Sequence, residues 1–181
     1  MKTKHKILRI IFIGIIMGFF GCGSSNYAPL DVVDKVDVQR YLGKWYEIAL
    51  LPNSFEKGCN CTTAEYSLID STTIRVINSC RKDSVKGKVD QANGKAFVVE
   101  GSNNAKLRVQ FFWPFRGDYW IIDLDKENYS YSVVGAPSRK YLWILSRTSK
   151  MDEGIYKRLI ERCKDKGFDV SKLQKTKQEC D

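Results

Sequence analysis

Cysteine is the residue type in this sequence with the most chemistry to offer, because six cysteines accompany a single histidine among 181 residues. The histidine is His5, at the start of the chain. A folded part that lacks histidine has no Ser-His-Asp or Cys-His relay and no His-containing zinc site. Cys59 and Cys61 have a spacing that metal ligands use, but no second pair matches them. We therefore expect no catalytic residue, no metal site and no cofactor.

The first residues have the pattern of an export signal. Four basic residues, Lys2, Lys4, Lys6 and Arg9, precede an apolar run over residues 10–20. This run is too short for a permanent transmembrane helix, which needs about 20 apolar residues. It has the length of the hydrophobic region of a signal peptide. The sequence therefore predicts a signal over residues 1–21.

The end of this run resembles the lipobox of bacterial lipoproteins. Gly21 and Cys22 are followed by small residues, although the two Phe residues before Gly21 depart from the usual aliphatic and small pair. The resemblance implies that Cys22 is acylated and becomes the mature N-terminus. It also implies more than one acyl chain, because a single chain gives only marginal membrane binding. Residues 22–38 then form a tether and lead-in. The absence of Asp after Cys22 implies the outer membrane, while ordinary cleavage nearby or an uncleaved anchor stays open.

The net charge of +9 is concentrated at the two ends of the chain. Removal of the four basic residues of the signal leaves +5, and residues 157–177 alone hold eight basic and three acidic residues. This segment has no interleaved aromatic platform of the kind that nucleic-acid-binding proteins use. We expect a solvated helix face and no nucleic-acid partner, with contact to anionic lipid headgroups as the alternative.

The middle of the chain has the pattern of an all-β fold. Between Gly43 and Arg147, short segments rich in Val, Ile and aromatic residues alternate with turn-forming residues. The segments predict strands at residues 43–51, 62–69, 73–80, 85–98, 106–112, 118–124, 129–135 and 141–147, the fourth bent near Asn93 and Gly94. Because eight such strands in an open sheet would expose two edges, we expect them to close into an up-and-down antiparallel barrel.

A helix is predicted after the last strand. Asp152 stands where a helix would begin, and Gly167 stands where it would end. Between them, apolar residues recur at helical spacing: Tyr156, Leu159, Ile160 and Cys163. A helix with one apolar stripe must pack on another element, and we expect this one to lie on the outside of the barrel. Residues 39–181 would then form one domain.

The first strand resembles the Gly-x-Trp signature of lipocalins, in the form seen in bacterial lipocalins and their apolipoprotein-D-like relatives. Gly43 and Trp45 carry it, within the segment Gly43-Lys44-Trp45-Tyr46-Glu47-Ile48-Ala49. The resemblance implies that Trp45 closes one end of the barrel and that Arg147, at the end of the last strand, stacks on it. Further matches run in order from about residue 36 to residue 178, and together they identify a bacterial outer-membrane lipocalin.

The family resemblance implies a carrier that stores or transports fatty acids or lysophospholipids for envelope maintenance. Alternation puts apolar side chains on the inward face, where a ligand would contact them. Its predicted contacts are Trp143, Phe112, Val109, Phe111, Tyr66, Val76 and, for a headgroup at the mouth, Arg116, with Ala49, Leu68, Val98 and Leu107 on the same inward face. Arg139 and Lys140 are further headgroup candidates. For Trp113-Pro114-Phe115 we expect a packed corner, with membrane contact as the alternative.

The cysteines that remain after acylation of Cys22 are disulfide candidates in an oxidising compartment. Their number, five, is odd. The family pattern implies a disulfide between Cys59 and Cys80 and a second between Cys61 and Cys180, which would leave Cys163 buried on the helix. The rival to the second pair is Cys163 with Cys180.

Two alternatives to the carrier stay open. One is a structural or protein-binding envelope lipoprotein whose barrel is filled by its own side chains. The other is an enzyme on the same fold, a thiol-dependent isomerase, for which Cys61 is the candidate nucleophile, without a neighbouring histidine to activate it. The expected partners are a single-chain lipid and the membrane, and the sequence leaves the oligomeric state open.

Overall fold

Nine strands and three helical segments make up residues 28–180, the part of the chain that the computed structural model describes. The strands are β1 Gly43–Leu50, β2 Cys59–Leu68, β3 Thr73–Lys82, β4 Val89–Val98, β5 Lys106–Gln110, β6 Gly117–Leu124, β7 Tyr131–Gly135, β8 Leu142–Ser146 and β9 Gln174–Lys175. The helical segments are α1 Val38–Tyr41, α2 Glu153–Asp165 and the short 3-10 helix Val170–Lys172. No helix among these residues is long and apolar enough to cross a membrane.

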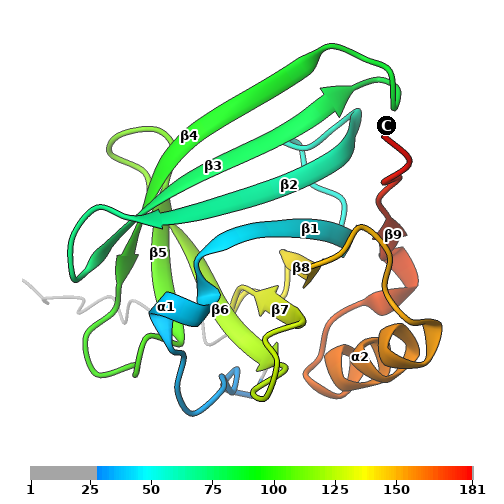
Figure 1. Cartoon of the computed structure of the whole chain (residues 1–181). Coiled ribbons are helices and arrows are strands. Elements are labelled where there is room, and N and C mark those ends of the chain that lie inside the picture. The colour runs from blue at the N-terminus through cyan, green and yellow to red at the C-terminus, as the bar shows by residue number, and fades with distance from the viewer. Residues whose placement is uncertain (1–27, 181) are drawn as a thin grey trace, which may run out of the picture.

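The first eight strands close into the expected antiparallel barrel. Each of β2 to β7 is hydrogen-bonded to the next strand along the chain, β8 pairs with β1, and β1 pairs with β2 (Figure 1). β9 adds a short pairing on β1. Because neighbouring strands in the sequence are neighbours in the barrel, the up-and-down order predicted from the sequence is confirmed.

The fourth strand is where the structure and the prediction differ most. The fourth strand begins at Val89 rather than at residue 85, because residues 83–88 form the turn from β3. The β3–β4 register continues through Asn93 and Gly94 without a shift, so no bulge accompanies the bend predicted there. Gly94 serves close packing instead, since a Cβ there would lie 2.7 Å from Cδ1 of Phe111.

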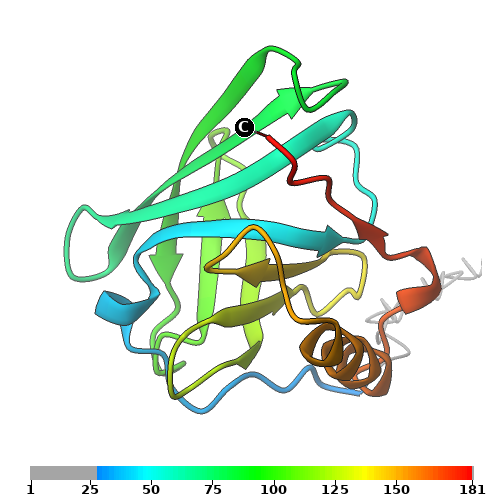
Figure 2. The same cartoon turned by 45° about the vertical axis from the view of Figure 1, so that its right-hand side comes forward.

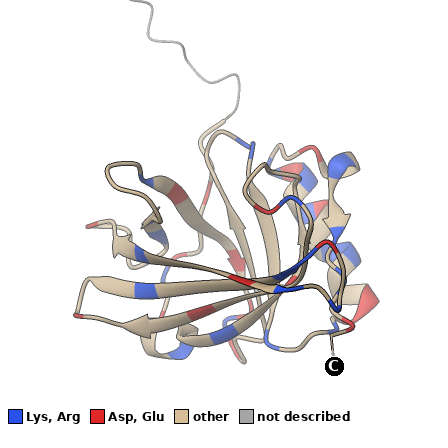
Figure 3. Ribbon diagram, turned by 90° about the horizontal axis from the view of Figure 1, so that it is seen from above, with Lys and Arg blue, Asp and Glu red and all other residues tan. Residues whose placement is uncertain are grey.

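Helix α2 lies on the outside of the barrel, as predicted. The carboxylate of Asp152 caps it by accepting a 2.9 Å hydrogen bond from the backbone N–H of Ile155. Its buried side chains are Tyr156, Leu159 and Cys163. They belong to an outer cluster with apolar residues of β1, β6, β7 and β8, namely Ile48, Ala49, Ile122, Val133, Leu142 and Ile144. Basic and acidic positions are interspersed along the strands and around this region (Figure 3).

Ala49 was expected on the inward face, and this expectation is wrong. The side chain is fully buried, but in the outer cluster under α2. The cause is a register shift between Glu47 and Ala49 in the β1–β8 pairing, which breaks the alternation that begins at Trp45. Leu68 also departs from its expected place, because it lies at the end of β2 and is 39% exposed.

One end of the barrel is closed by aromatic side chains and by Arg147. The guanidinium carbon of Arg147 lies 3.8 Å from the centre of the Trp45 ring, and the Trp45 Nε1–H donates to the backbone oxygen of Tyr41 at 2.8 Å. Arg147 also donates to the backbone oxygens of Arg40, Lys44 and Tyr129. The guanidinium therefore ties α1, β1 and the β6–β7 turn together over the indole ring.

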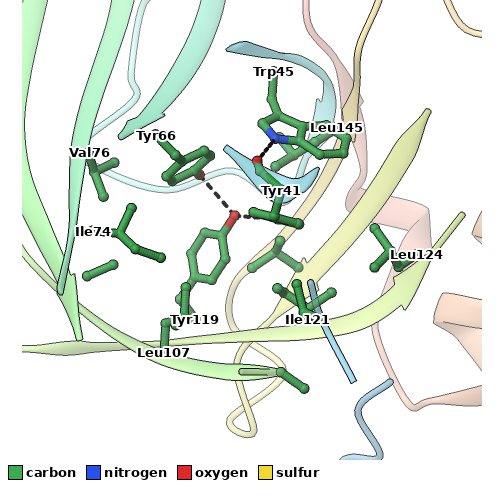
Figure 4. Close-up of a cluster of buried hydrophobic side chains, with 14 of the residues drawn as sticks. Tyr41, Trp45, Tyr66, Ile74, Val76, Leu107, Tyr119, Ile121, Leu124 and Leu145 are labelled. Atoms are coloured by element: carbon green, nitrogen blue, oxygen red, sulfur yellow. Dashed lines mark hydrogen bonds between the residues drawn. The ribbon is translucent and has the colours of Figure 1, made fainter. Parts of the chain in front are cut away.

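Three tyrosine hydroxyls meet beneath this closed end. The hydroxyl of Tyr119 lies 2.9 Å from those of Tyr41 and Tyr66 (Figure 4). Tyr41 also contacts the hydroxyl of Ser132 at 3.0 Å. Burial raises the pKa of Tyr41 to about 12. The hydroxyls therefore stay protonated, and they hydrogen-bond with one another in place of water. They complete the inner cluster, which also contains Ile74, Val76, Leu107, Ile121 and Leu124.

The close approach at Gly94 gives a test of the barrel packing. We expect Gly94→Ala to lower the free energy of unfolding by about 1–3 kcal/mol, because the new methyl group would also lie 2.8 Å from the backbone oxygen of Gln110. Urea denaturation followed by tryptophan fluorescence measures this. Gly117→Ala is the matched control, since its Cβ would meet only Cγ2 of Val109, at 3.7 Å. Equal losses in the two variants would contradict this packing.

The Arg147 contacts give a second test. We expect Arg147→Lys to destabilise the fold by about 1.5–3 kcal/mol, because an ammonium group keeps the charge but cannot donate to three carbonyls from one plane. Arg75→Lys, at an exposed position on β3, is the control and should change stability little. Chemical denaturation of the two variants makes the comparison, and an unchanged Arg147→Lys midpoint would argue against the closing role.

Candidate functional site

Most of the side chains predicted to contact a ligand lie inside the barrel. Tyr66 and Val76 are buried in the inner cluster (Figure 4). Val109, Phe111 and Trp143 are partly buried and pack against that cluster. These three side chains are less buried than the large side chains at the closed end, which are fully covered. The barrel is thus filled at one end and lined by incompletely covered apolar side chains farther along.

Phe112 does not line the interior as predicted, and Arg116, predicted for a headgroup at the mouth, lies in the loop between β5 and β6. β5 ends at Gln110, so the alternation used to place Phe112 does not reach it, and its side chain is 78% exposed in the β5–β6 loop. Arg116 is exposed and stacks its guanidinium 4.1 Å from the ring of Phe97. Phe97 lies on the outward face of β4, next to the inward Ala96. Phe112 is therefore outside the barrel interior, whereas the role of Arg116 at the mouth stays a prediction.

The expectation of a packed corner at residues 113–115 is also wrong. Trp113 is 86% exposed and Phe115 is 77% exposed. Of the headgroup candidates on the β7–β8 loop, Arg139 is buried and donates to the backbone oxygens of Ala28, Pro137 and Lys166. Its hydrogen bonds link the chain segment before β1 to the end of α2. Arg139 therefore stabilises the fold.

Two glutamate side chains meet inside the barrel, and the sequence analysis missed both. Glu47, on β1, is 4% exposed. Glu56, on the loop between β1 and β2, accepts a 3.0 Å hydrogen bond from Nε1 of Trp143 through Oε1. Burial raises the pKa of Glu47 well above its usual range, and the adjacent carboxyl of Glu56 raises it further. The pair therefore holds a proton on Glu47 at pH values where an exposed glutamate has lost it.

Polar atoms without partners surround this pair. Within residues 28–180, the buried side-chain atoms that make no hydrogen bond include Oδ1 of Asn78 and Nδ2 of Asn53. Thr62 is itself only 8% exposed. A hydrogen bond from its hydroxyl to the Glu47 carboxyl offsets part of the rise in the Glu47 pKa. Orphaned buried polar atoms are costly, and a bound ligand is one way to satisfy them.

The strand register explains why these residues gather. Thr62 follows the inward residues Tyr66 and Ala64 on β2 at intervals of two, and Asn78 lies opposite Ala64 on β3. Glu47 is the next residue on β1 beyond the pair of Tyr46 with Thr63. We call Glu47, Glu56, Thr62 and Asn78 the inner polar cluster. Spacing by two from Trp45 is the signal that places Glu47 inside, whereas nothing in the sequence indicates Glu56 on its loop.

The C-terminal tail covers the seam between β1 and β2 beside this cluster. It runs from β9 across the gap between the two strands (Figure 2). The backbone N–H of Thr176 donates to Ile48, and the N–H of Cys61 donates to Lys177. The Gln178 amide bridges the two strands by donating to the backbone oxygens of Glu47 and Thr62. The hydroxyl of Thr176 also donates to Oε1 of Glu47.

Two disulfides have the expected pairing, Cys59 with Cys80 and Cys61 with Cys180. The first joins β2 to β3, and the second holds the tail against β2. The rival pair of Cys163 with Cys180 is therefore wrong. Cys163 is free and buried under α2, where burial raises the pKa of its thiol to about 12.

A groove lies on the outside of the barrel, between α2 and the C-terminal tail. Its volume is about 450 Å³, and its lining includes Met151, Glu153, Tyr156, Lys175 and Gln178. Glu153 and Lys175 form an ion pair across it, and the ammonium group of Lys175 lies 4.5 Å from the centre of the Tyr156 ring. Glu153 and Lys175 thus satisfy each other's charge within this groove.

The raised pKa of Glu47 has a consequence for stability. The unfolded chain ionises a glutamate near pH 4.3, whereas the folded protein keeps Glu47 protonated to higher pH. The stabilising contribution is complete below about pH 4 and is lost as the pH rises through the folded-state pKa. We therefore expect Glu47→Gln, which resembles the protonated form, to gain stability over the original protein with rising pH. Urea denaturation at several pH values measures the difference, and parallel profiles would contradict it.

Comparison with known proteins gives the family. The family described as Lipocalin-like domain matches residues 36–178. Outer membrane lipoprotein Blc of Vibrio cholerae is 45% identical over 141 residues, which cover 78% of this chain and 82% of that protein. Apolipoprotein D of Macaca fascicularis is 32% identical over 186 residues, which cover 96% of each chain.

A solved structure agrees on the fold. Insecticyanin from the tobacco hornworm Manduca sexta superposes with a TM-score of 0.67 at 21% identity, covering 83% of this chain and 85% of that chain. An identity this low supports a shared fold only. The family and the outer-membrane location rest on the sequence relatives. The chain therefore belongs to the lipocalin family, and its similarity to the Blc proteins places it among the outer-membrane lipoproteins of that family.

Proposed function

We propose that this protein binds single-chain lipids, fatty acids or lysophospholipids, inside the barrel and stores or transports them in maintenance of the cell envelope. The observation that carries the proposal is the set of incompletely buried apolar side chains beyond the closed end. Val98, Val109, Phe111 and Trp143 present apolar surface there. Each methylene group that moves from water onto such surface gains about 0.8 kcal/mol, so an acyl chain needs few specific contacts to bind.

The anchor belongs to the same proposal. The export signal over residues 1–21, the acylated Cys22 and the first part of the tether over residues 22–38 lie outside the described residues, which begin at residue 28. The lipobox-like sequence around Cys22 supports lipid attachment. A protein anchored in this way would hold its barrel, residues 39–181, close to the membrane from which it takes its ligand.

The lipid-binding proposal is tested with the full chain in phospholipid nanodiscs. We expect palmitate or a lysophospholipid to quench tryptophan fluorescence, relative to protein-free nanodiscs, and Val109→Asp to weaken this binding by at least about tenfold, because a charge on the apolar wall opposes burial of an acyl chain. Val89→Asp is the matched control, since Val89 is 52% exposed at the start of β4. Failure of every single-chain lipid to bind would overturn the proposal.

A second candidate is a structural envelope lipoprotein with a filled barrel. The observation that favours it is the closed end, where Tyr41, Trp45, Tyr66 and Tyr119 occupy the interior and contact one another. A filled barrel predicts that no single-chain lipid changes the melting temperature, whereas a carrier is stabilised by its ligand.

The enzymatic alternative has lost its candidate nucleophile. Cys61 is in a disulfide with Cys180, and the free thiol of Cys163 is buried under α2 with a raised pKa. Because the thiolate is the reactive form, Cys163 is a poor nucleophile. We therefore propose that the protein binds its ligand without chemical change, in keeping with a family of binding proteins.

A further inference from the structure

The loops at the open end of the barrel carry exposed aromatic side chains. Because the strands alternate in direction, the loops that join β1 to β2, β3 to β4, β5 to β6 and β7 to β8 lie at the end opposite Trp45 and Arg147. These loops, which we call the mouth loops, are residues 51–58, 83–88, 111–116 and 136–141. Among residues 28–180, every exposed aromatic side chain lies on them, namely Phe55, Phe112, Trp113, Phe115 and Tyr141. Such a concentration of exposed apolar groups at one end marks an interaction surface.

The β5–β6 loop is the most exposed of the four. Phe112, Trp113 and Phe115 are each at least 77% exposed. In Figure 1 this loop lies at the top of the barrel, above β5 and β6, whereas α1 lies near the bottom. The rings of Phe55 and Tyr141 contact each other with their centres 5.6 Å apart, so the β1–β2 and β7–β8 loops lie side by side.

The two ends of the barrel differ in the sign of their exposed charge. The exposed charged side chains on the mouth loops are five basic and one acidic, namely Lys57, Lys86, Lys88, Arg116, Lys140 and Asp83. On the loops that follow β2, β4 and β6 at the closed end they are three acidic and one basic, namely Asp70, Glu100, Glu127 and Lys126. An anionic surface would therefore attract the mouth and repel the closed end.

The chain segment that leads to Cys22 starts beside the mouth. The described residues begin at Ala28, whose backbone oxygen accepts a 2.7 Å hydrogen bond from Nη2 of Arg139 on the β7–β8 loop. Cys22 is six positions before Ala28. Since six residues of extended chain reach at most about 20 Å, a bilayer that holds acyl chains on Cys22 lies within about 20 Å of this loop.

Helix α2 is the other basic surface, but it has no apolar side chain to insert into a bilayer. Lys157, Arg158 and Lys164 are exposed on it, whereas none of its large apolar side chains is exposed. An element that lies in a membrane interface needs apolar side chains to insert as well as basic side chains that attract anionic lipid. The mouth loops have both.

We propose that the mouth loops dock on an anionic phospholipid bilayer, with Phe112, Trp113 and Phe115 inserted among the headgroups. This inference rests on the proposed anchor at Cys22 and adds the orientation of the barrel. Aromatic side chains favour the membrane interface, and the basic side chains around them attract lipid phosphates. The open end then faces the bilayer, so a single-chain lipid passes between bilayer and barrel without crossing bulk water.

Brominated lipids measure whether Trp113 enters the bilayer. The full chain, purified from membranes, is reconstituted into vesicles of phosphatidylglycerol and brominated phosphatidylcholine, and its tryptophan emission is compared with that in unbrominated vesicles. Trp113→Ser isolates the loop, because the other tryptophans, Trp45, Trp120 and Trp143, lie on strands. We expect the original protein to be quenched at least about threefold more than Trp113→Ser, because a tryptophan in the interface contacts the brominated acyl chains.

A reporter at the closed end is the matched control. Ile69, on the turn between β2 and β3, is 43% exposed. Ile69→Trp is made in the Trp113→Ser background, and we expect brominated lipid to quench it no more than that background. Quenching at Ile69→Trp equal to that at Trp113 would overturn the inference, because the barrel would have no preferred end toward the bilayer.

The role of charge is tested by lipid composition and by variants. Replacement of phosphatidylglycerol by phosphatidylcholine should reduce the quenching of Trp113 by at least about twofold, because the attraction of basic side chains to the surface is lost. Lys86→Gln combined with Lys88→Gln should reduce it in the anionic vesicles. Lys35→Gln combined with Lys44→Gln, exposed before and at the start of β1, is the matched control. Equal quenching in neutral vesicles and in both double variants would overturn the anionic surface as the partner.

The outcomes separate this inference from the proposals on which it rests. Failure of the chain to float with the vesicles in a density gradient would overturn the anchor and the docking together. Flotation without extra quenching of Trp113 would overturn the docking alone, and palmitate binding in nanodiscs would still report the carrier function. A shift of the Trp113 emission to shorter wavelength without quenching by brominated lipid would also overturn the docking, because the loop would then pack against a second copy of the chain.

Discussion

Closure of the barrel between β1 and β2 is the constraint on which the rest of the structure depends. The two strands pair over a short stretch, from Gly43 with Tyr66 to Tyr46 with Thr63. Trp45 lies within that stretch, so the closed end forms where the strands hold each other directly. Beyond it the strands separate, and only the C-terminal tail spans the gap. The barrel is thus sealed by backbone pairing at one end and by the tail farther along.

The separation of β1 from β2 also creates the polar interior. Backbone and side-chain groups near a broken strand pairing need other partners, because buried polar groups are rarely left unpaired. Gln178 and Thr176 satisfy several of them, while Oδ1 of Asn78 stays unsatisfied. The same feature therefore accounts for the position of the tail and for the inner polar cluster.

The sequence predicted the architecture well because period-two alternation and turn residues repeat through the whole middle of the chain. It misplaced side chains where local geometry departs from that period. Ala49 follows a register shift in β1, and Phe112 follows the end of β5, so neither obeys the alternation of its segment. Glu56 is harder still, since a loop residue has no periodic signal. Its place depends on tertiary contact with Trp143.

The disulfide between Cys61 and Cys180 joins residues that are 119 positions apart. The segment between them contains most of β2 and every later strand and helix, so most of the domain is one covalent ring. A single proteolytic cut anywhere in that ring would open it without releasing a fragment. Envelope proteins share their compartment with proteases, and a carrier closed in this way keeps its parts together after the first cut.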